Sequence, residues 1–536
     1  MYIILTTGLL ALASSVFADV TYNVVAFPDA STNRYAVEID KKFHALRTSE
    51  ATFPLWSANV AGVSTSSSYR YVQLNSDNII ISREKFQRQF SNKDATATPN
   101  EFFNRQTTIT TLPAIKQVYK DIRPEPSKAF DSSQIATIHL TADPTMFADL
   151  MNNPLDKEYK DIKVGFKFIN ADTVYSVSKA KLAVSGNSSR KFKKTSLRVK
   201  FNDDKGETFF DRPIIKLRAE ATDPTMIREK LYLDLLNSVG VATYQGSYVR
   251  VYVNGVSHGF YLMVEDIEEP FLMNTIHHGA ISDKKALGSL YQMGLREATM
   301  VYEGSSAHHY NPRVYSTKIS SPKDKDMQQW IAFMKDLKDW DPAAPGGVAY
   351  WNQRLDLDGF LRSMALEYLT GAWDAFWYRG HNFFMYNNPQ RKVWQFIPTD
   401  FDHTFMSGNR PDVHATYKKF AEGAKRKKFT ARPLVTKLIY KNKDINKQFE
   451  TILSTITQDV FNSRVLDARI DAYKTQIEQD VAWDFLIDRS ELPGKKIHWT
   501  IDHFSTRIEG RNGKKISGLK PWISNRAKTV LDHIVE

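Results

Sequence analysis

The chain has 536 residues, of which 42% are hydrophobic and 12% aromatic, so it can bury large cores in about two to four domains and is not a disordered protein. It contains no cysteine, which excludes disulfides, thiol catalysis and cysteine-ligated zinc. The formal net charge of +12 favours attraction to acidic polymers, phosphates or acidic protein segments, and no signature of a nucleic-acid-binding fold accompanies it.

Residues 1–18 form an apolar run that ends in Val16-Phe17-Ala18, which fits the A-x-A-like rule for a cleavage site. The pattern predicts a signal peptide cleaved before Asp19, and therefore a secreted protein. A buried N-terminal helix or a membrane anchor is the alternative, but the run is too short to span a bilayer comfortably. No later segment is apolar for long enough to cross a membrane, and the C-terminal residues lack the hydrophobic tail of a GPI signal. We therefore expect no transmembrane segment and no GPI anchor.

The next stretch, residues 19–122, favours β-strands. Alternating or β-branched runs are separated by clusters of Pro, Asn, Asp and Ser, and they occupy residues 21–27, 34–39, 68–74 and 78–82. Serines between residues 64 and 68 predict a loop. The pattern indicates a small antiparallel β-sandwich that serves as an accessory domain. The prolines in residues 123–127 cannot continue a sheet and mark a domain boundary.

Strand-like segments resume at residues 136–140, 164–168 and 180–186. The sequence SGNSS at residues 185–189 connects the last of them to a further strand. Its backbone N–H groups, with the side chains of Asn187 and Ser188, could line a phosphate, or the segment could be an ordinary hairpin turn. Asn187 also begins the one glycosylation sequon that we find, and we expect it to be unmodified because a glycan would obstruct a pocket there.

Period-two alternation from Lys194 to Phe201 places basic residues on one face of a strand. This face is either solvated or supplies a cation for nucleotide phosphates, with Lys194 as the first candidate and Arg198 as the alternative. A helix is predicted from Asp223-Pro224 to Gly240. Glu229 lies on its apolar stripe without an intrahelical cation, so it is either at the edge of the stripe or needs a partner from elsewhere, such as Lys194.

Two strands then flank Asn254-Gly255, a strong hairpin signal, and the second strand ends near Glu265. Residues 280–325 have the composition of an insertion. A helix is predicted over residues 358–369 from its apolar periodicity. Lysines and arginines gather at residues 418–428, where they form either a solvated run or a docking site for acidic or phosphorylated substrates.

The most informative stretch is residues 373–406. It predicts a loop with Asp374 and Asn382, a strand at 383–386, a tight turn, and a returning strand at 392–397 that leads to Asp400 and Asp402. Because a tight hairpin brings the outer ends of its strands together, these four side chains are expected in one small volume. Carboxylate and amide oxygens suit Mg²⁺ or Mn²⁺, so we predict a metal site for phosphoryl transfer.

Four segments together carry a family resemblance: GNSSRKFKKTSLRVKF, GFYLMVEDIEEPFL, GHNFFMY and FIPTDFDHTF, in this order. Over roughly residues 130–480 the chain resembles the spore coat protein CotH family of atypical protein kinases, including secreted fungal members. The resemblance implies an α+β fold, a two-lobed protein-kinase-like architecture that follows the N-terminal β-sandwich. Its N-lobe would span residues 130–270 and its helical C-lobe residues 271–536.

The resemblance also implies ATP as cofactor and phosphorylation of Ser or Thr in secreted, spore-coat or cell-wall proteins. Asp374 would be the catalytic base, and the metal ligands would be Asn382, Asp400 and Asp402. The nucleotide would be held by residues Asn187, Ser188, Lys194, Glu229 and Glu265. The chain departs from other protein kinases in having no HRD or DFG motif. Its segment DFDHTF looks like the DFGHxF metal segment of lipid-kinase-type enzymes, with Asp402 where Gly is expected.

Two other functions use the same residues. Some fungal relatives act as ligands for host receptors, so the chain could be a non-catalytic adhesin on a kinase-like scaffold. A metal-dependent phosphoesterase could use His381 and His403 as ligands of a two-metal cluster. In that case Lys194 and Glu229 would have no evident purpose.

Overall fold

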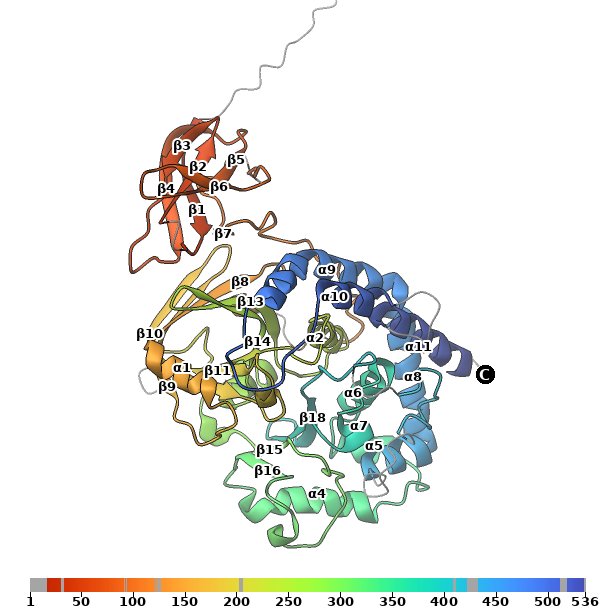
Figure 1. Cartoon of the computed structure of the whole chain (residues 1–536). Coiled ribbons are helices and arrows are strands. Elements are labelled where there is room, and N and C mark those ends of the chain that lie inside the picture. The colour runs from red at the N-terminus through yellow and green to blue at the C-terminus, as the bar shows by residue number, and fades with distance from the viewer. Residues whose placement is uncertain are drawn as a thin grey trace, which may run out of the picture.

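The structure, a computed structural model, describes residues 17–29, 33–90, 92, 94–120, 122, 127–201, 206–407, 411–421, 432–510 and 518–534. Three predicted features fall wholly or mainly outside the described residues: the signal peptide up to residue 16, the proline-rich boundary at 123–126, and the basic residues 425–428. The fold is a mixed α+β arrangement in which an N-terminal pair of sheets, a barrel and a helical region follow one another along the chain (Figure 1).

Two small sheets form the N-terminal part and share one core of valine and aromatic side chains. The strands are β1 (Phe17–Val25), β2 (Arg34–Ile39), β3 (Lys42–Ala45), β4 (Leu55–Ser64), β5 (Tyr69–Leu74), β6 (Ile80–Arg83) and β7 (Glu101–Phe102). They pair in the orders β4-β1-β7 and β3-β2-β5-β6. The predicted strands are present, and β4 is an addition whose last residue, Ser64, was assigned to a loop.

A closed seven-stranded barrel follows, with strand order β10-β11-β12-β14-β13-β8-β9. Its strands are β8 (Ala136–Ala142), β9 (Ile162–Ile169), β10 (Val174–Ser185), β11 (Ser196–Lys200), β12 (Ile214–Arg218), β13 (Gly246–Val253) and β14 (Val256–Glu265). Apolar residues alternate with polar ones along β9 and β11, so the barrel interior is filled by residues such as Phe166, Leu182 and Leu197. Helix α1 (Pro144–Asn152) packs against β9 and β10.

Helix α2 (Arg228–Ser238) lies between the barrel and the helical region, as its residues in the largest core show. The helix begins four residues later than the predicted start at Asp223-Pro224, since its N-cap is Ile227 and no side chain caps it. The carboxylate of Asp223 instead accepts hydrogen bonds from the backbone N–H groups of Thr225 and Arg228 and so stabilises the turn that precedes the helix. The hairpin at Asn254-Gly255 is confirmed, because β13 and β14 pair on either side of these two residues.

The helical region contains α4 (Gln328–Asp339), α5 (Gly347–Asn352), α6 (Leu357–Thr370), α7 (Phe376–Arg379), α8 (Lys443–Asp459), α9 (Ser463–Leu486), α10 (Ile501–Glu509) and α11 (Leu519–Ile534). Helix α6 matches the predicted helix and is almost wholly buried. No helix among the described residues has both the length and the apolar character that crossing a membrane requires.

A four-stranded sheet accompanies these helices, in the order β16-β15-β17-β18. The hairpin predicted in residues 383–397 is its pair β17 (Phe383–Asn388) and β18 (Val393–Pro398). Strands β15 (Leu290–Met293) and β16 (Ser316–Ile319) come from the stretch predicted as an insertion. Because β15 pairs directly with β17, part of this stretch belongs to the core of the fold, which corrects that prediction.

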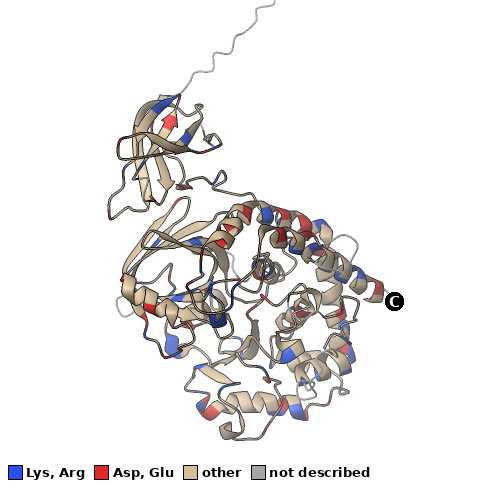
Figure 2. Ribbon diagram, viewed as in Figure 1, with Lys and Arg blue, Asp and Glu red and all other residues tan. Residues whose placement is uncertain are grey.

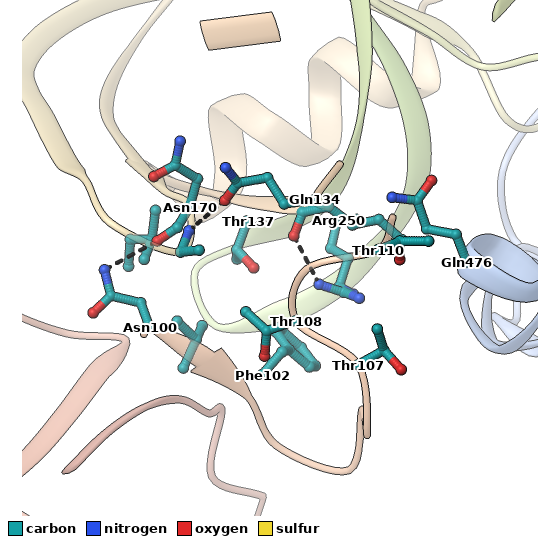
Figure 3. Close-up of a pocket in the computed structure, with 14 residues that line it drawn as sticks. Asn100, Phe102, Thr107, Thr108, Thr110, Gln134, Thr137, Asn170, Arg250 and Gln476 are labelled. Carbon is teal, nitrogen blue, oxygen red and sulfur yellow. Dashed lines mark hydrogen bonds between the residues drawn. The ribbon is translucent and has the colours of Figure 1, made fainter. Parts of the chain in front are cut away.

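A buried ion-pair cluster joins the N-terminal sheets to the rest of the chain. Asp480 on α9 accepts hydrogen bonds from Arg250 on β13 at 2.7 and 2.8 Å and from Arg105 at 2.9 Å. Beside it lies a small cavity of about 20 Å³, into which polar side chains such as Gln134 and Thr108 point (Figure 3). That volume suits a single water molecule, so this cavity is not a ligand site.

Candidate active site

A cleft between the barrel and the β15–β18 sheet encloses a cavity of about 560 Å³. Its size is that of a small-molecule site. Most of the predicted site residues line it: Asn187, Ser188, Glu265, Asp374, Asn382, Asp400 and Asp402. Segments as far apart in the sequence as those of Asn187 and Asp402 therefore meet in one place.

The β17–β18 hairpin brings the two acidic loops together, as its sequence predicted. The backbone N–H of Thr399 donates to the carbonyl of Asn382 at 3.0 Å, and the side-chain amide of Asn382 donates to the carbonyl of Asp374 at 2.9 Å. Asn382 and Asp400 both have left-handed backbone conformations, with φ of 57° and 63°. Such conformations at non-glycine residues cluster at functional sites.

Asp374 lies among three basic side chains. Arg296 and Arg379 each place a guanidinium nitrogen 3.4 Å from its carboxylate, and Nδ1 of His381 lies 3.5 Å away. Burial alone would raise the pKa of Asp374, but the hydrogen bond and charge of His381, with the charge of His403, hold it below its ordinary value. The carboxylate is therefore ionised at neutral pH and can accept a proton.

Asp400 and Asp402 differ in their surroundings. Burial acts to raise the pKa of Asp400, but its contact with Arg218 at 2.5 Å outweighs burial and lowers that pKa. Asp402 accepts a hydrogen bond from Thr222 at 2.7 Å, and burial raises its pKa. Among the described residues, Asp402 has no cation closer than Nε2 of His403, which lies 4.0 Å away.

Arg218, at the end of β12, is the partner of Glu229. Its Nε lies 2.6 Å from the Glu229 carboxylate, and the Tyr244 hydroxyl donates to the other oxygen of Glu229 at 2.5 Å. Burial raises the pKa of Glu229 to about 7 against the opposing effect of Arg218. The prediction that Glu229 needs a cation from elsewhere in the chain is confirmed, and that cation is Arg218.

Lys194 contacts Asp484 instead of Glu229, so the predicted Lys194–Glu229 pair is incorrect. Its ammonium donates to the Phe260 carbonyl at 2.5 Å and to Asp484 on α9 at 2.9 Å, and the residue is only 3% exposed. Burial lowers the pKa of Lys194 to about 8, although Asp484 acts in the opposite direction. Arg198, the alternative candidate, pairs with Asp161 at 3.2 Å.

Glu220 is a further acidic residue of the cleft. It is 5% exposed, neither carboxylate oxygen has a hydrogen-bond partner, and its nearest cation is Arg218 at 3.5 Å. Burial, followed by the charge of Glu229, raises the pKa of Glu220 well above its ordinary value. The carboxylates of Glu220, Glu229 and Asp400 thus all lie within 3.5 Å of the Arg218 guanidinium group.

This cluster of carboxylates fits a divalent cation, because a bound cation would oppose the burial that raises the pKa values of Glu220, Glu229 and Asp402. Asn382, Asp400 and Asp402 offer the hard oxygen donors that Mg²⁺ and Mn²⁺ prefer. No three acidic or histidine side chains converge on a single point within the described residues. A site of this kind would take its remaining ligands from water and from the phosphates of a nucleotide, as Mg²⁺ sites commonly do.

The loop at residues 186–189 forms one wall of the cleft. Gly186 has φ of +85°, and a Cβ there would lie 2.0 Å from the Ser189 hydroxyl oxygen, so glycine is required. Arg190 fixes the loop, because its guanidinium donates to the carbonyls of Gly186 at 2.7 Å and Pro154 at 2.9 Å. Asn187 is held at its side-chain oxygen by Lys157 at 2.9 Å.

The opposite end of the cleft is less polar. Val264, Ile267, Met293 and Phe384 line it and offer the apolar surface that a purine base needs. Glu265 lines the cleft as predicted, but its carboxylate binds Arg212 at 3.0 Å and the Gln245 backbone N–H at 3.0 Å. Its carboxylate is therefore not available to a ligand, and only its backbone groups could form hydrogen bonds with a purine base.

Several residues of the site were not predicted from the sequence: Arg190, Arg218, Glu220, Thr222, Tyr244, Arg296 and Arg379. A signal existed for Arg218, since Lys216 and Arg218 alternate with apolar residues in β12 as Lys194 to Lys200 do around β11. Arg296 had none, because it lies within residues 280–325, the stretch predicted as an insertion.

Comparison with known proteins confirms the resemblance that these residues suggested. A family profile described as "CotH kinase protein" matches residues 182–530, which include every predicted site residue. The chain is 27% identical to "Spore coat protein homolog 1" of Rhizopus delemar, across 98% of this chain and 83% of that protein. It is 26% identical to "Invasin CotH3" of the same fungus, across 96% and 84%. It is also 26% identical to "Inner spore coat protein H" of Bacillus subtilis, across 56% and 78%.

Proposed function

The chain belongs to the CotH kinase protein family, and from this premise we propose that it is a secreted, metal-dependent protein kinase that transfers the γ-phosphate of ATP to Ser or Thr. One observation carries the proposal. A single cleft unites Asp374, Asn382, Asp400 and Asp402 with a glycine-containing loop and an arginine that is held by a buried glutamate. These are the parts that phosphoryl transfer requires.

The nucleotide lies with its base against Val264 and Ile267 and its phosphates towards the loop at residues 186–189. Arg218 takes the part that a lysine plays in other kinases, because it faces the phosphates while Glu229 fixes its orientation. Asn382, Asp400 and Asp402 hold the divalent ion, which neutralises phosphate charge when it is bound. Arginine is well suited to this position, since its planar group binds two partners at once.

Asp374 accepts the proton of the substrate hydroxyl. The hydroxyl oxygen forms a bond to the γ-phosphorus, the bond between that phosphorus and the β,γ-bridging oxygen breaks, and the proton passes to the Asp374 carboxylate. Its surroundings support this role, because His381 and the arginines keep the carboxylate ionised and oriented. A positioned base of this kind contributes about 10²- to 10⁴-fold to the rate.

We place the substrates among secreted proteins of a spore coat or cell wall. The support for this is the predicted signal peptide and the names of two relatives, "Spore coat protein homolog 1" and "Inner spore coat protein H". A two-metal phosphoesterase is less well supported, because both ring nitrogens of His381 face oxygen atoms of the protein. One is 2.9 Å from the Gly294 carbonyl and the other 3.5 Å from Asp374.

The test is incubation of the purified chain with labelled ATP, a divalent cation and a mixture of serine- and threonine-containing peptides. We expect label on Ser or Thr with the wild type, and its loss with Asp374→Ala, with Asp400→Ala, and on chelation of the metal. Asp339→Ala is the matched control, since Asp339 is an exposed acid on α4. Equal labelling by all variants would refute the assignment of the site.

A second candidate function is adhesion to a host receptor. The observation that favours it is the similarity, across nearly the whole chain, to proteins named invasins. In this case binding to host cells would be the same for wild type and Asp374→Ala, and no label would reach any peptide. The two functions can coexist, and the Asp374→Ala variant separates them.

A further inference from the structure

Three lysines form a row on the outer face of the barrel. Lys181 on β10 is directly opposite Lys200 on β11, and on its other side it is directly opposite Lys163 on β9. A fourth, Lys179, lies beside them. Together with Thr141, Gly165 and Ser178 they line a cavity of about 450 Å³ whose inner side includes Val164 and Phe201. We call it the lysine groove.

Within the described ranges of the chain, these ammonium groups have no partner. Among the described residues, no side chain makes a hydrogen bond or an ion pair with any of the four lysines of the groove. The helices differ, since acidic and basic residues are interspersed on α9 and α11 (Figure 2). There Lys520 pairs with Asp471 at 2.6 Å, and Lys528 with Asp532 at 2.6 Å.

A row of unpaired lysines on neighbouring strands destabilises the folded state. Residues directly opposite each other on neighbouring strands have Cβ atoms about 5 Å apart, and like charges there are destabilising. In the lysine groove this occurs twice in one row, at Lys163–Lys181 and at Lys181–Lys200. An anion that bridges the row would convert the repulsion into attraction, so the groove fits a ligand with several negative charges.

The groove and the active-site cleft lie on the same two strands. Ser185 pairs with Ser196, four residues along from the Lys181–Lys200 pair. Four is an even number, so the side chains of both pairs point to the same face of the sheet, and both serines line the cleft. The Lys181–Lys200 pair and the Ser185–Ser196 pair are separated by about 13 Å along the strands, which is the length of about four residues of extended peptide.

We propose that the lysine groove binds a phosphoserine in the protein substrate while another serine of the same segment occupies the active site. A phosphate group carries a charge of about −1.5 to −2 and three acceptor oxygens, which match a row of three ammonium groups better than a single carboxylate does. The inference rests on the proposed function, because the kinase itself would create such phosphoserines. Each phosphate transferred would then favour transfer to a neighbouring serine.

The first test measures binding and needs no kinase activity. It uses fluorescent twelve-residue peptides that contain an acceptor serine and, four residues away, either serine, glutamate or phosphoserine. Fluorescence anisotropy with the full chain is expected to show affinity for the phosphoserine peptide at least about tenfold above that for the serine peptide. Glutamate should give an intermediate value. In Lys181→Glu/Lys200→Glu, and to a smaller extent in Lys181→Gln/Lys200→Gln, the preference should disappear.

The matched control is Lys42→Glu/Lys85→Glu, which makes the same change in charge at exposed lysines of the N-terminal sheets. It should retain the preference for phosphoserine. The inference is overturned if the phosphoserine peptide binds no better than the serine peptide. It is also overturned if the groove variants keep the preference and ADP abolishes it, because the phosphate would then be bound in the nucleotide cleft.

The second test measures kinetics. With the phosphoserine peptide as substrate, Lys181→Glu/Lys200→Glu should raise KM about tenfold, to the value for the serine peptide, with kcat and the KM for ATP unchanged. A change in kcat on both peptides would instead indicate damage to the cleft and overturn the assignment. Should the chain phosphorylate neither peptide, the proposed kinase function fails, and the binding measurement still decides whether the groove recognises phosphoserine.

Discussion

Nε of Arg218 lies 2.6 Å from the carboxylate of Glu229, and another nitrogen of the same guanidinium group lies 2.5 Å from Asp400. One side chain therefore connects the end of β12, helix α2 and the loop after β18. The carboxylates hold the pKa of Arg218 above its ordinary value although burial acts to lower it. Any movement between the barrel and the β17–β18 hairpin must stretch or break this contact.

Replacing Arg218 by alanine should impair both catalysis and stability. Loss of the cation that we propose to face the phosphates is expected to lower kcat/KM for ATP by about 10²-fold or more. Removal of one partner of a buried ion pair also leaves Glu229 uncompensated, at a cost of about 3 kcal/mol in the free energy of unfolding. Steady-state kinetics and urea denaturation measure the two effects. Arg218→Lys should recover part of both, because it keeps the charge but cannot reach Glu229 and Asp400 together.

Arg198→Ala is the control for this prediction. Arg198 lies on the neighbouring strand β11 and pairs with Asp161, so its loss should change kcat/KM by less than about twofold and stability by less than about 1 kcal/mol. If Arg198→Ala impaired ATP use as strongly as Arg218→Ala does, the assignment of the phosphate-binding cation would be wrong.

The sequence predicted the hairpin and its acidic ends, because those contacts are local. Asn382 and Thr399 are brought together by a tight turn whose residues can be read directly. It could not identify the partner of Glu229. Alternation assigns Lys194 and Arg218 to strand faces, but which strand borders the cleft depends on barrel closure, and Lys194 is drawn away by Asp484, 290 residues later. Contacts of that range leave no local pattern.

Lys194 is expected to be a stabilising residue rather than a nucleotide ligand. Asp484 also accepts hydrogen bonds from the Phe260 N–H and from Arg489, both at 2.9 Å, so α9 is fastened to β14 through this cluster. Lys194→Met should lower the free energy of unfolding by about 2 to 3 kcal/mol and leave the KM for ATP within about twofold. Thermal melts and ATP kinetics on one preparation provide both values. A tenfold rise in the KM for ATP at unchanged stability would contradict this assignment.

Arg190 should act on nucleotide affinity through the loop at residues 186–189. Its guanidinium holds the carbonyls of Gly186 and Pro154, and without it the loop loses its fixed position. We expect Arg190→Ala to raise the KM for ATP about tenfold with a smaller change in kcat, since the loss is mainly one of binding. Lys191→Ala is the matched control, because Lys191 is exposed beside it. Indistinguishable kinetics for the two variants would show that the loop does not contact the nucleotide.

Glu367 should make the stability of the fold depend on pH. It lies on α6, is 1% exposed, and accepts a hydrogen bond from the Trp377 N–H at 2.7 Å. Burial raises its pKa to about 8, although the hydrogen bonds from Trp377 and Phe376 act to lower it. The folded chain therefore binds a proton that the unfolded chain, with a pKa of about 4.3, releases. Stability must fall as pH rises from that value through about 8.

Glu367→Gln removes this titration while keeping an oxygen that can accept from Trp377. The free energy of unfolding of the variant, relative to wild type, should therefore increase between about pH 5 and pH 8.5, as measured by urea denaturation at several pH values. For Glu478→Gln, at an exposed position on α9, the free energy of unfolding should change with pH in the same way as that of the wild type. Parallel profiles for Glu367→Gln and wild type would mean that Glu367 is already ionised in the folded chain. Glu367 accepts its hydrogen bond from the first turn of α7, the helix that connects Asp374 to His381. A change in the protonation of Glu367 is therefore expected to affect the position of these two site residues.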